Sequence, residues 1–341
     1  MNIYDIAKLA NVSKTTVSRV INGSPHVSDK LKKKVLDILN EYNYVPSASA
    51  RNLAGRFTKS IAIMAINILH TNYSTITYNI ERKARFLGYN VYLCNTTENP
   101  QEQEHYLRMF TDKNLDCLIM IGDAYNNKTV ANLLPIFYSK VPIITFNCIF
   151  EGKNIYNVYG KMDVGIEKAM NYLYELGHRK IVFIRNYNSS ISELKVNMYL
   201  KKMQEFGLPV ADNMIYSTFY GYDSGIDAVN YFKENNTEYT AVIGCDDLTA
   251  IGIIKGLKAI GKSVPQDVSV IGYLNSIHAR TSEPELTTID NNIDEIADSI
   301  CKMLSGALAK QSIPSKIHII PSLVIRESTA SPLALKSSSN L

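Results

Sequence analysis

Two adjacent aspartates, Asp246 and Asp247, come closest to the carboxylate pair that acid–base catalysis uses. They follow an apolar run at 240–244, so they stand where a helix begins, and neighbouring side chains there point in different directions. Capping the helix is therefore the simpler role for them. The sequence holds no phosphate-binding loop, dinucleotide-binding turn, zinc-binding helix or nucleophile elbow. Five histidines stand singly, at His70, His105, His178, His278 and His318. We expect no catalytic residue, no metal and no cofactor, and infer that the chain is not an enzyme.

Attraction of a polyanion is a different chemistry, and the placement of charge points to it. Residues 1–60 hold ten Lys and Arg against four Asp and Glu, a formal charge of +6, whereas the rest of the chain carries −2. A small basic module beside a nearly neutral body is typical of nucleic-acid binding, because each phosphate contact releases condensed counterions. A solvated charged face explains the charge alone equally well.

Composition sets the class of protein. With 341 residues, 46% hydrophobic and 20% charged, the chain is globular and long enough for two or three domains. Its five cysteines are scattered and form no C-x-x-C pair, so we expect buried thiols in a reducing compartment. The first residues hold no apolar signal region, and the longest nearly apolar run, Ile61 to Leu69, is half a membrane span. We expect a cytoplasmic protein with no membrane partner.

The basic module divides into three helical segments. Asn2 is a cap for the first, Ser13 caps the second over Lys14 to Ile21, and Ser28 caps the third. Asn22-Gly23 is a C-terminal stop signal for the second helix. Two short helices around a tight turn, braced by a third, form a helix-turn-helix, in which the second helix presents its N-terminal side chains to the major groove.

The same segment resembles the LacI/GalR repressor family. The matching runs are Tyr4-Asp5-Ile6-Ala7, Val12-Ser13, Thr16-Val17-Ser18-Arg19-Val20-Ile21-Asn22-Gly23, Val27-Ser28, Tyr44-Val45-Pro46 and Ala50-Arg51-x-Leu53. A pattern this long and ordered is far more specific than a lone short motif. The resemblance implies a helix-turn-helix DNA-binding domain over residues 1–45.

The resemblance also assigns roles to single positions. Lys14 and Thr15 stand where family members read bases, and Arg19 stands where an arginine contacts a base or a phosphate. Further DNA contacts, mostly to phosphates, are expected from Tyr4, Ser13, Thr16, Ser18, Asn22, His26 and Ser28. For His26, an ordinary exposed loop histidine is an equal alternative.

A hinge helix or linker is expected over residues 46–59, and within it residues 46–56 are small, polar and short of packing side chains. A plain flexible linker is one interpretation, because such a segment cannot hold a helix alone. The resemblance implies instead a hinge helix that folds on DNA, with Ala50 and Leu53 among its contacts and Leu53 wedged into a minor-groove step. An isolated leucine in a polar stretch favours the hinge-helix interpretation over the plain linker.

Beyond residue 60, short apolar runs alternate with amphipathic segments. The expected strands cover 60–67, 90–94, 116–121, 141–146, 180–184, 240–244 and 267–272. The expected helices cover 75–88, 101–113, 128–139, 163–177, 192–206, 223–234, 247–260 and 292–308. This alternation predicts an α/β body of two doubly wound parallel-sheet subdomains, with a ligand cleft between their carboxyl edges.

The resemblance continues through the body to about Arg326. It rests on the runs Leu173 to Ile181, Ala241 to Gly252, Gly261 to Tyr273 and Leu286 to Ile289. It implies an effector-binding and dimerisation domain over 60–330, similar to periplasmic binding proteins. The N-subdomain is then expected at about 60–157 and 290–316, the C-subdomain at about 158–289 and 317–330, and a disordered tail at 331–341. No leucine-heptad helix ends the chain, so a dimer is the expected assembly.

Positions in the cleft depart from the family pattern. Lys195 replaces an effector-binding arginine, which keeps the charge and loses the bidentate fork. Leu274 replaces an aspartate that commonly binds a sugar hydroxyl. The expected effector contacts are His70, Asn72, Tyr73, Asn147, Lys195, Tyr220, Asp246 and Asn275. Each of them, taken alone, fits a structural residue at the cleft edge equally well.

Together these features predict a homodimeric repressor of a carbohydrate-utilisation operon. It would bind a pseudo-palindromic operator and respond to a small-molecule effector, a sugar or sugar phosphate, in the cleft. One alternative is a catabolite-control type regulator that responds to a phosphocarrier protein, for which Arg82, Lys83 and Arg85 offer basic contacts. A cytoplasmic sugar-binding module without a DNA target is the other, and residues 1–56 argue against it.

Overall fold

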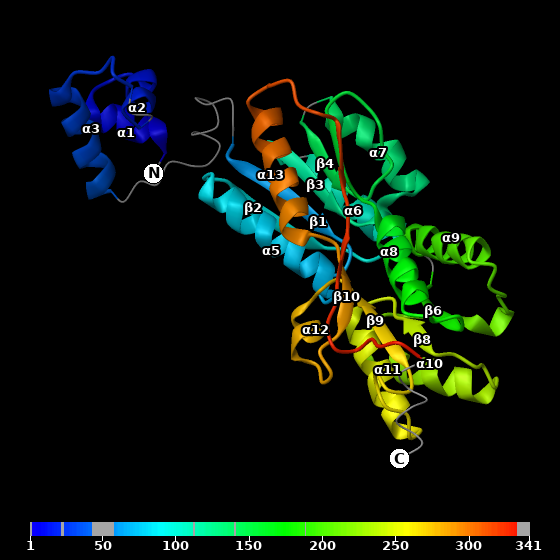
Figure 1. Ribbon diagram of the computed structural model, residues 1–341. Coiled ribbons are helices and arrows are strands. Elements are labelled where there is room, and N and C mark those ends of the chain that lie inside the picture. Colours follow the sequence, from blue (N-terminus) through cyan, green and yellow to red (C-terminus); the bar gives the residue numbers. More distant parts are fainter. Residues whose placement is uncertain are drawn as a thin grey trace.

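The computed structural model describes residues 2–21, 24–42, 58–111, 113–139, 141–187 and 189–332. Asn22, Ala50 and Leu53 lie outside the described residues, as do nearly all of the expected hinge and most of the expected tail. The described chain forms a three-helix N-terminal module and a body with two sheets (Figure 1). Among these residues, no helix combines the length and apolar character that crossing a membrane requires.

The N-terminal module consists of α1 (Ile3–Ala10), α2 (Lys14–Ile21) and α3 (Asp29–Glu41). Asn2 and Asp5 form a reciprocal capping box that starts α1. Ser13 Oγ accepts a 3.1 Å hydrogen bond from the Thr16 amide, which confirms Ser13 as the cap of α2. Ser28 stands at the N-cap position of α3, but its side chain makes no capping bond.

Apolar residues one turn apart hold the three helices together. Ile6, Ala10, Val17 and Val35 are fully buried in the common core of the module. Val17 lies on the inner face of α2, so Lys14, Thr15 and Arg19 are left exposed on its outer face. The core therefore determines which face of α2 is available to a partner.

The first subdomain is built on a six-stranded parallel sheet. Its strands, in spatial order, are β11 (Lys316–Ile319), β5 (Ile155–Gly160), β4 (Ile143–Phe146), β3 (Cys117–Ile121), β1 (Ser60–Ala65) and β2 (Asn90–Asn95). One face packs against α5 (Thr71–Phe86) and α13 (Ile293–Leu308), and the other against α6 (Pro100–Thr111) and α7 (Lys128–Tyr138). Within β1, Ile61 and Ile63 face the first helix pair while Ala62 and Met64 face the second, so the strand is apolar from Ile61 to Ala65.

The second subdomain repeats this architecture. Its strand order is β12 (Ser322–Val324), β10 (Thr287–Asp290), β9 (Ser269–Tyr273), β8 (Ala241–Ile243), β6 (Ile181–Asn186) and β7 (Ile215–Thr218). Helices α8 (Met162–Glu175) and α9 (Ser190–Glu205) pack together, as do α10 (Tyr222–Glu234) and α11 (Asp247–Ala259). The expected all-parallel sheet needs one correction, because β12 pairs with β10 in antiparallel orientation. The chain enters β12 directly after crossing from the first sheet, with no helix to reverse its direction.

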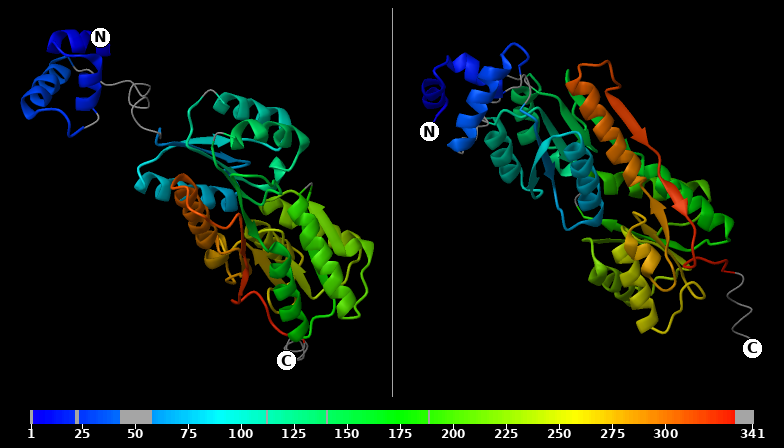
Figure 2. Two further views of the ribbon diagram at one scale, coloured as in Figure 1. Left: turned by 90° about the horizontal axis from the view of Figure 1, so that it is seen from above. Right: turned by 90° about the vertical axis from the view of Figure 1, so that its left-hand side faces the viewer.

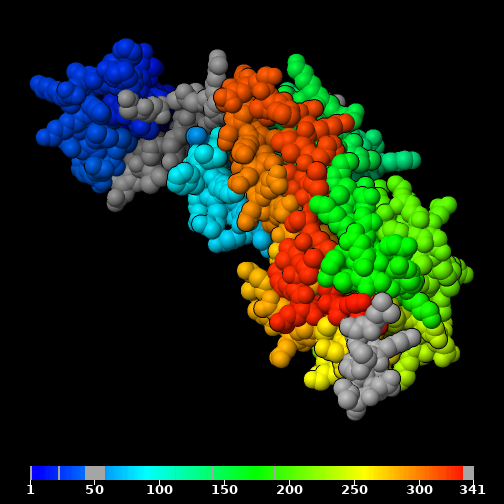
Figure 3. All heavy atoms as spheres, in the orientation of Figure 1, coloured from blue at the N-terminus to red at the C-terminus, as the bar shows by residue number. Residues whose placement is uncertain are grey.

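Three crossover segments, at 160–162, 290–293 and 319–322, carry the chain between the two sheets. Figure 2 shows the two subdomains joined by these segments, and Figure 3 shows the last described stretch, in red, running over their junction. The loops that follow the strands of both sheets meet in the space between the subdomains. Short helices η1 (Asp123–Tyr125), η2 (Asp212–Met214) and α12 (Ile277–Thr281) complete the described elements.

Candidate nucleic-acid interface and ligand cleft

The N-terminal module presents an exposed basic surface. Its described basic side chains are all exposed: Lys8, Lys14, Arg19, Lys30, Lys32, Lys33 and Lys34. At the start of α2, Lys14 Nζ donates a 3.1 Å hydrogen bond to Tyr4 Oη and lies 4.7 Å from the centre of the Tyr4 ring. The aromatic ring of α1 thus orients the first side chain of α2, while Lys14 keeps its other donors free.

The remaining predicted DNA contacts lie around the same helix start. Ser13 and Thr16 hydroxyls are 2.9 Å apart and hydrogen-bonded, Thr15 is exposed beside them, and Ser18 is half-buried one turn further on. His26 and Ser28 are exposed in the segment that leads into α3. An exposed basic helix with its hydroxyl groups at one end can contact phosphates and base edges together.

Between the subdomains lies a cleft with two adjoining cavities, of about 180 Å³ and about 30 Å³. A wider cavity of about 710 Å³ adjoins the first of them at Thr71, Leu274 and Ser276. The first two are both lined by His70, Tyr220 and Leu274. The larger of these two also contacts Asp246, and the smaller one contacts Asn72, Tyr73, Asn147 and Lys195. The structure therefore brings together seven of the eight residues expected to bind an effector.

Several buried polar atoms of this cleft have no hydrogen-bond partner within the described chain. They are both ring nitrogens of His70, Asn72 Oδ1, Ser276 Oγ and Asn291 Oδ1. Each of these residues lines one of the two cavities. Because buried polar atoms are almost always paired in folded proteins, these atoms indicate a site completed by a ligand or by water.

His70 links the two subdomains inside the cleft. Its ring centre lies 4.3 Å from that of Tyr220, edge to face, and 5.2 Å from that of Tyr73. Its Nε2 is 3.9 Å from Asp246 Oδ2, beyond hydrogen-bond distance. Burial lowers the pKa of His70, the Asp246 carboxylate opposes this effect, and the Lys195 charge adds to it. The imidazole is therefore neutral near pH 7, with one donor and one acceptor available.

Lys195 contributes a buried cation. Its side chain extends from α9 toward Tyr273, and Nζ lies 3.4 Å from the centre of that ring. Burial lowers the pKa of Lys195 to about 8, although the nearby Cys245, Asp246 and Asp123 act in the opposite direction and raise it. Near pH 7 the ammonium thus stays charged in a largely water-free setting.

The two aspartates considered for acid–base chemistry have structural roles. Asp246 Oδ1 accepts a 2.6 Å hydrogen bond from the Thr249 amide, which confirms it as the cap of α11. Asp247 accepts bonds from the Ser276 amide and from Thr288 Oγ1, and burial raises its pKa to about 6. The two carboxylates point to different partners, as expected at a helix start.

Sequence reasoning missed Asp123, which joins the two subdomains. This residue follows β3, and its Oδ2 accepts hydrogen bonds from Ser189 Oγ at 3.0 Å, Ser190 Oγ at 2.9 Å and the Ile191 amide at 3.2 Å. The last three groups form the start of α9 in the second subdomain. Ser276 and Asn291 were missed as well, although all three follow strands at the carboxyl edge of a sheet, which is the signal that finds them.

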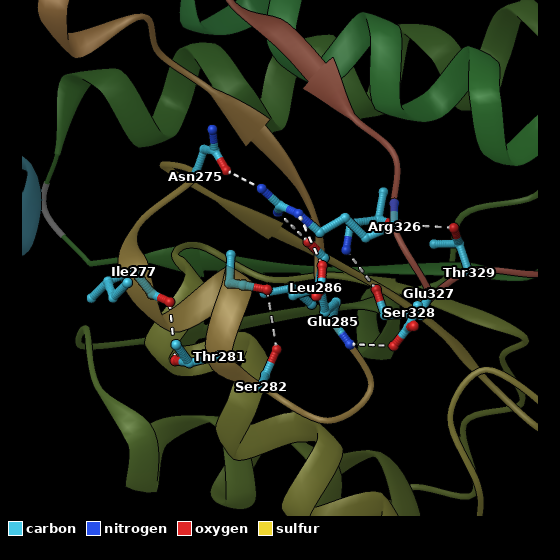
Figure 4. Close-up of polar contacts among 12 residues, drawn as sticks. Asn275, Ile277, Thr281, Ser282, Glu285, Leu286, Arg326, Glu327, Ser328 and Thr329 are labelled. Atoms are coloured by element: carbon cyan, nitrogen blue, oxygen red, sulfur yellow. Dashed lines mark hydrogen bonds and ion pairs between the residues drawn. The ribbon is translucent and has the colours of Figure 1, made fainter.

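Asn275 is the one predicted effector contact whose side chain does not line the cavities formed by the other seven. Its Oδ1 accepts a 2.6 Å bond from Arg326 Nη2 (Figure 4). Its Nδ2 donates a 2.8 Å bond to Asp290 Oδ2. Arg326 also donates to the Leu286 carbonyl. Asn275 lies in the loop before α12 with a left-handed backbone, φ 51°. It lines the adjoining cavity of about 710 Å³ and neither of the two smaller ones. It connects this loop to the crossover segment that begins at Asp290, so we leave it out of the ligand site.

Comparison with known proteins identifies the family. Residues 2–47 match the family described as bacterial regulatory proteins, lacI family, and residues 170–329 match the periplasmic binding protein-like domain. An HTH-type transcriptional regulator of Lachnoclostridium phytofermentans is 33% identical over 332 residues, which cover 96% of this chain and 99% of that protein. The chain belongs to the LacI family. This LacI-family protein is a DNA-binding transcriptional regulator with a helix-turn-helix domain and an effector-binding domain.

Other LacI-family members agree with this assignment. Catabolite control protein A of Priestia megaterium is 31% identical over 332 residues, covering 96% of this chain and 99% of that protein. Among solved structures, a lac repressor dimer bound to operator and the anti-inducer ONPF has a TM-score of 0.84 at 23% identity, covering 97% of this chain and 99% of that one. The expected fold, a helix-turn-helix followed by two α/β subdomains, is thereby confirmed. Within the described residues, no group of three or more His, Cys, Asp or Glu is placed to hold a metal ion.

Proposed function

We propose that this LacI-family regulator is a repressor of a carbohydrate-utilisation operon, controlled by a small molecule in the inter-subdomain cleft. The observation that carries the proposal is the set of unpaired buried polar atoms, which come from both subdomains and face a common space. A ligand that pairs with atoms of both subdomains favours one angle between them over another. Tyrosine rings beside hydrogen-bonding groups suit a polyhydroxylated ligand.

The DNA contacts belong to the same proposal. We infer that Lys14, Thr15 and Arg19 read bases, while Tyr4 and the hydroxyl groups around α2 contact phosphates. Asn22, Ala50 and Leu53 remain expected contacts outside the described residues. A difference of about 1–3 kcal/mol in ligand affinity between two subdomain angles would change operator occupancy about 5–150-fold. Acting on DNA would place the protein in the cytoplasm.

A second copy of the chain is the expected partner. Phe86, at the end of α5, is 92% exposed, and Leu87, directly after it, and Leu93, on the edge strand β2, are also exposed on the first subdomain. Exposed apolar side chains that gather in a patch are typical of protein–protein interfaces. We infer a homodimer that uses this surface, so that two helix-turn-helix modules meet the two halves of a pseudo-palindromic operator.

The alternative control by a phosphocarrier protein rests on relatedness to catabolite control protein A. Of the three basic residues it would use, Lys83 is paired with Asp298 and Arg85 with Glu81. Arg82 is exposed, and its guanidinium lies 5.5 Å from the centre of the Tyr78 ring. Because two of the three charges are compensated within the chain, we prefer the small-molecule proposal.

Deletion of residues 1–56 separates DNA binding from ligand binding. The body has its own two cores, so the shortened chain is expected to bind the same small molecules as the full chain. Operator binding, measured by electrophoretic mobility shift, should vanish. Retained operator binding by the shortened chain would contradict the proposed role of the N-terminal module.

A further inference from the structure

The charges of the cleft are unequally compensated. Asp246 caps α11 through the Thr249 amide, and Asp123 receives three hydrogen bonds from the start of α9. Lys195, only 8% exposed, has no hydrogen bond and no ion pair within the described chain, and contacts the face of Tyr273. A buried ammonium without an anionic partner is costly unless a ligand supplies one.

The start of α5 faces the same space. Its N-cap residue, His70, forms no side-chain capping bond, so the first amide groups of α5 lack the partner that a cap would provide. Thr71 lines the larger cavity, and Asn72 and Tyr73 line the smaller one. An uncapped helix start carries partial positive charge and binds anions.

Two buried side chains independently point to a ligand at this position. Asn72 is 6% exposed and Asn291 is 2% exposed, and the Oδ1 atom of each lacks a partner in the described chain. Both line the cavity that also holds Lys195. Oxygen atoms of this kind accept hydrogen bonds from hydroxyl groups.

We propose that the effector is a small polyhydroxylated acid, whose anionic group binds between Lys195 and the start of α5 and whose hydroxyl groups bind Asn72 and Asn291. The inference rests on the proposed effector site and narrows its ligand to sugar acids or sugar phosphates. A neutral sugar would leave the Lys195 ammonium unpaired. Leu274, at the position where the family resemblance places an aspartate, removes one negative charge that would add to the repulsion of an anion by Asp123 and Asp246.

Thermal unfolding of the full chain with matched ligand pairs tests the inference. Glucose is compared with gluconate and glucose 6-phosphate, and galactose with galacturonate. The acid member of at least one pair should raise Tm, while its neutral counterpart at equal concentration should not. A response to the carboxylates alone identifies a sugar acid, and a response to the phosphate ester alone identifies a sugar phosphate.

Variants on α9 supply the control. Lys195→Met should weaken binding of the acid about 10–150-fold, as expected for the loss of a hydrogen bond to a charged group. Lys202→Met is the matched variant, because Lys202 is also buried on α9, at 7% exposed, but is paired with Glu205 and lies outside the cleft lining. It should leave the ligand response unchanged.

Three results would overturn the inference: equal shifts with the neutral sugars, acid binding that Lys195→Met does not weaken, or no shift with any acid. Operator binding by the unchanged protein is measured in parallel, by mobility shift. If that binding is specific while the acids fail, only the ligand class is wrong. If operator binding itself is absent, the proposed function fails independently of the ligand.

Discussion

Ser190 Oγ donates a 2.9 Å hydrogen bond to Asp123 Oδ2 across the cleft, and so joins the start of α9 to the loop after β3 in the other subdomain. The same carboxylate oxygen accepts bonds from Ser189 Oγ and the Ile191 amide. An anion at the start of a helix is also stabilised by the helix dipole. This side chain therefore helps to hold the two subdomains at the angle seen in the structure.

Asp123→Ala should open the cleft. Hydrogen bonds to a charged group contribute about 1.5–3 kcal/mol each, so losing even one of the three shifts the closed–open equilibrium by more than tenfold. Small-angle scattering of the full chain is expected to show a larger radius of gyration. Asp212→Ala, which removes an exposed carboxylate from η2, is the control and should change nothing. Identical scattering from both variants would show that Asp123 does not hold the subdomains together.

Arg19→Ala should weaken specific operator binding by about 1–3 kcal/mol, because Arg19 is exposed on α2 and its fork fits guanine O6 and N7. Lys14→Ala should likewise lower the affinity for operator more than the affinity for random DNA, because Lys14 is inferred to read a base from the start of α2. Fluorescence anisotropy on operator and random DNA measures both effects. Lys258→Ala, on the exposed side of α11, is the control. A loss of the same size in that variant would refute the assignment to α2.

Gly252→Ala should strongly destabilise the second subdomain. A Cβ at this position would lie 1.9 Å from the Tyr222 carbonyl oxygen, because α10 and α11 approach closely there. These helices begin beside Tyr220 and Asp246, so their contact also shapes the cleft. We expect at least about 2–3 kcal/mol less free energy of unfolding in urea.

Gly207→Ala is the matched substitution for Gly252→Ala. Its Cβ would meet nothing within 4 Å, and only the left-handed backbone, φ +65°, would be strained. A cost of about 1 kcal/mol is expected. Equal losses at the two positions would mean that the close approach of α10 and α11 does not limit stability.

Acid should destabilise the protein through His178. The side chain is fully buried between Thr240 Oγ1 and the Ala330 carbonyl, both at 2.9 Å, and burial lowers its pKa to about 4. Its ordinary pKa is near 6.5, so between these values the unfolded chain binds more protons than the folded one. The free energy of unfolding should therefore fall by up to about 3 kcal/mol as the pH drops from 6.5 to 4.

Unfolding in urea at several pH values measures this contribution. His178→Gln should flatten the dependence between pH 4 and 6.5, whereas His105→Gln, on an exposed position of α6, should leave it unchanged. If the wild-type slope persists in His178→Gln, the acid sensitivity arises from other groups.

Local patterns in the sequence were sufficient for the N-terminal module and for the central strands. Asn2, Ser13 and the buried valines of α2 follow from capping preferences and helical spacing, which depend only on near neighbours. Five strands were not predicted, because they lack a continuous apolar run: Ile155–Gly160, Ile215–Thr218, Thr287–Asp290, Lys316–Ile319 and Ser322–Val324. Most of them are short and lie at or next to a sheet edge, where partial exposure removes the continuous apolar signal.

The ligand cleft was predicted in part, for a physical reason. Residues that directly follow strands reach the carboxyl edge of a parallel sheet, which places His70, Tyr220 and Asp246 correctly. Asn275 obeys the same rule, yet its side chain binds Arg326, a partner 51 positions away that no local pattern specifies. Asp123 likewise depends on a contact with the other subdomain. Interactions between distant segments decide which strand-end residues face the cleft.

The most direct test is fluorescence anisotropy of the full chain on DNA from its own promoter region, with and without sugars, sugar acids and sugar phosphates. We predict tight, salt-sensitive binding to a short palindrome, relieved by one of the acids. Specific binding that no compound alters would favour control by a phosphocarrier protein. Binding with no preference for the promoter over random DNA at physiological salt would contradict the assignment as an operator-binding repressor.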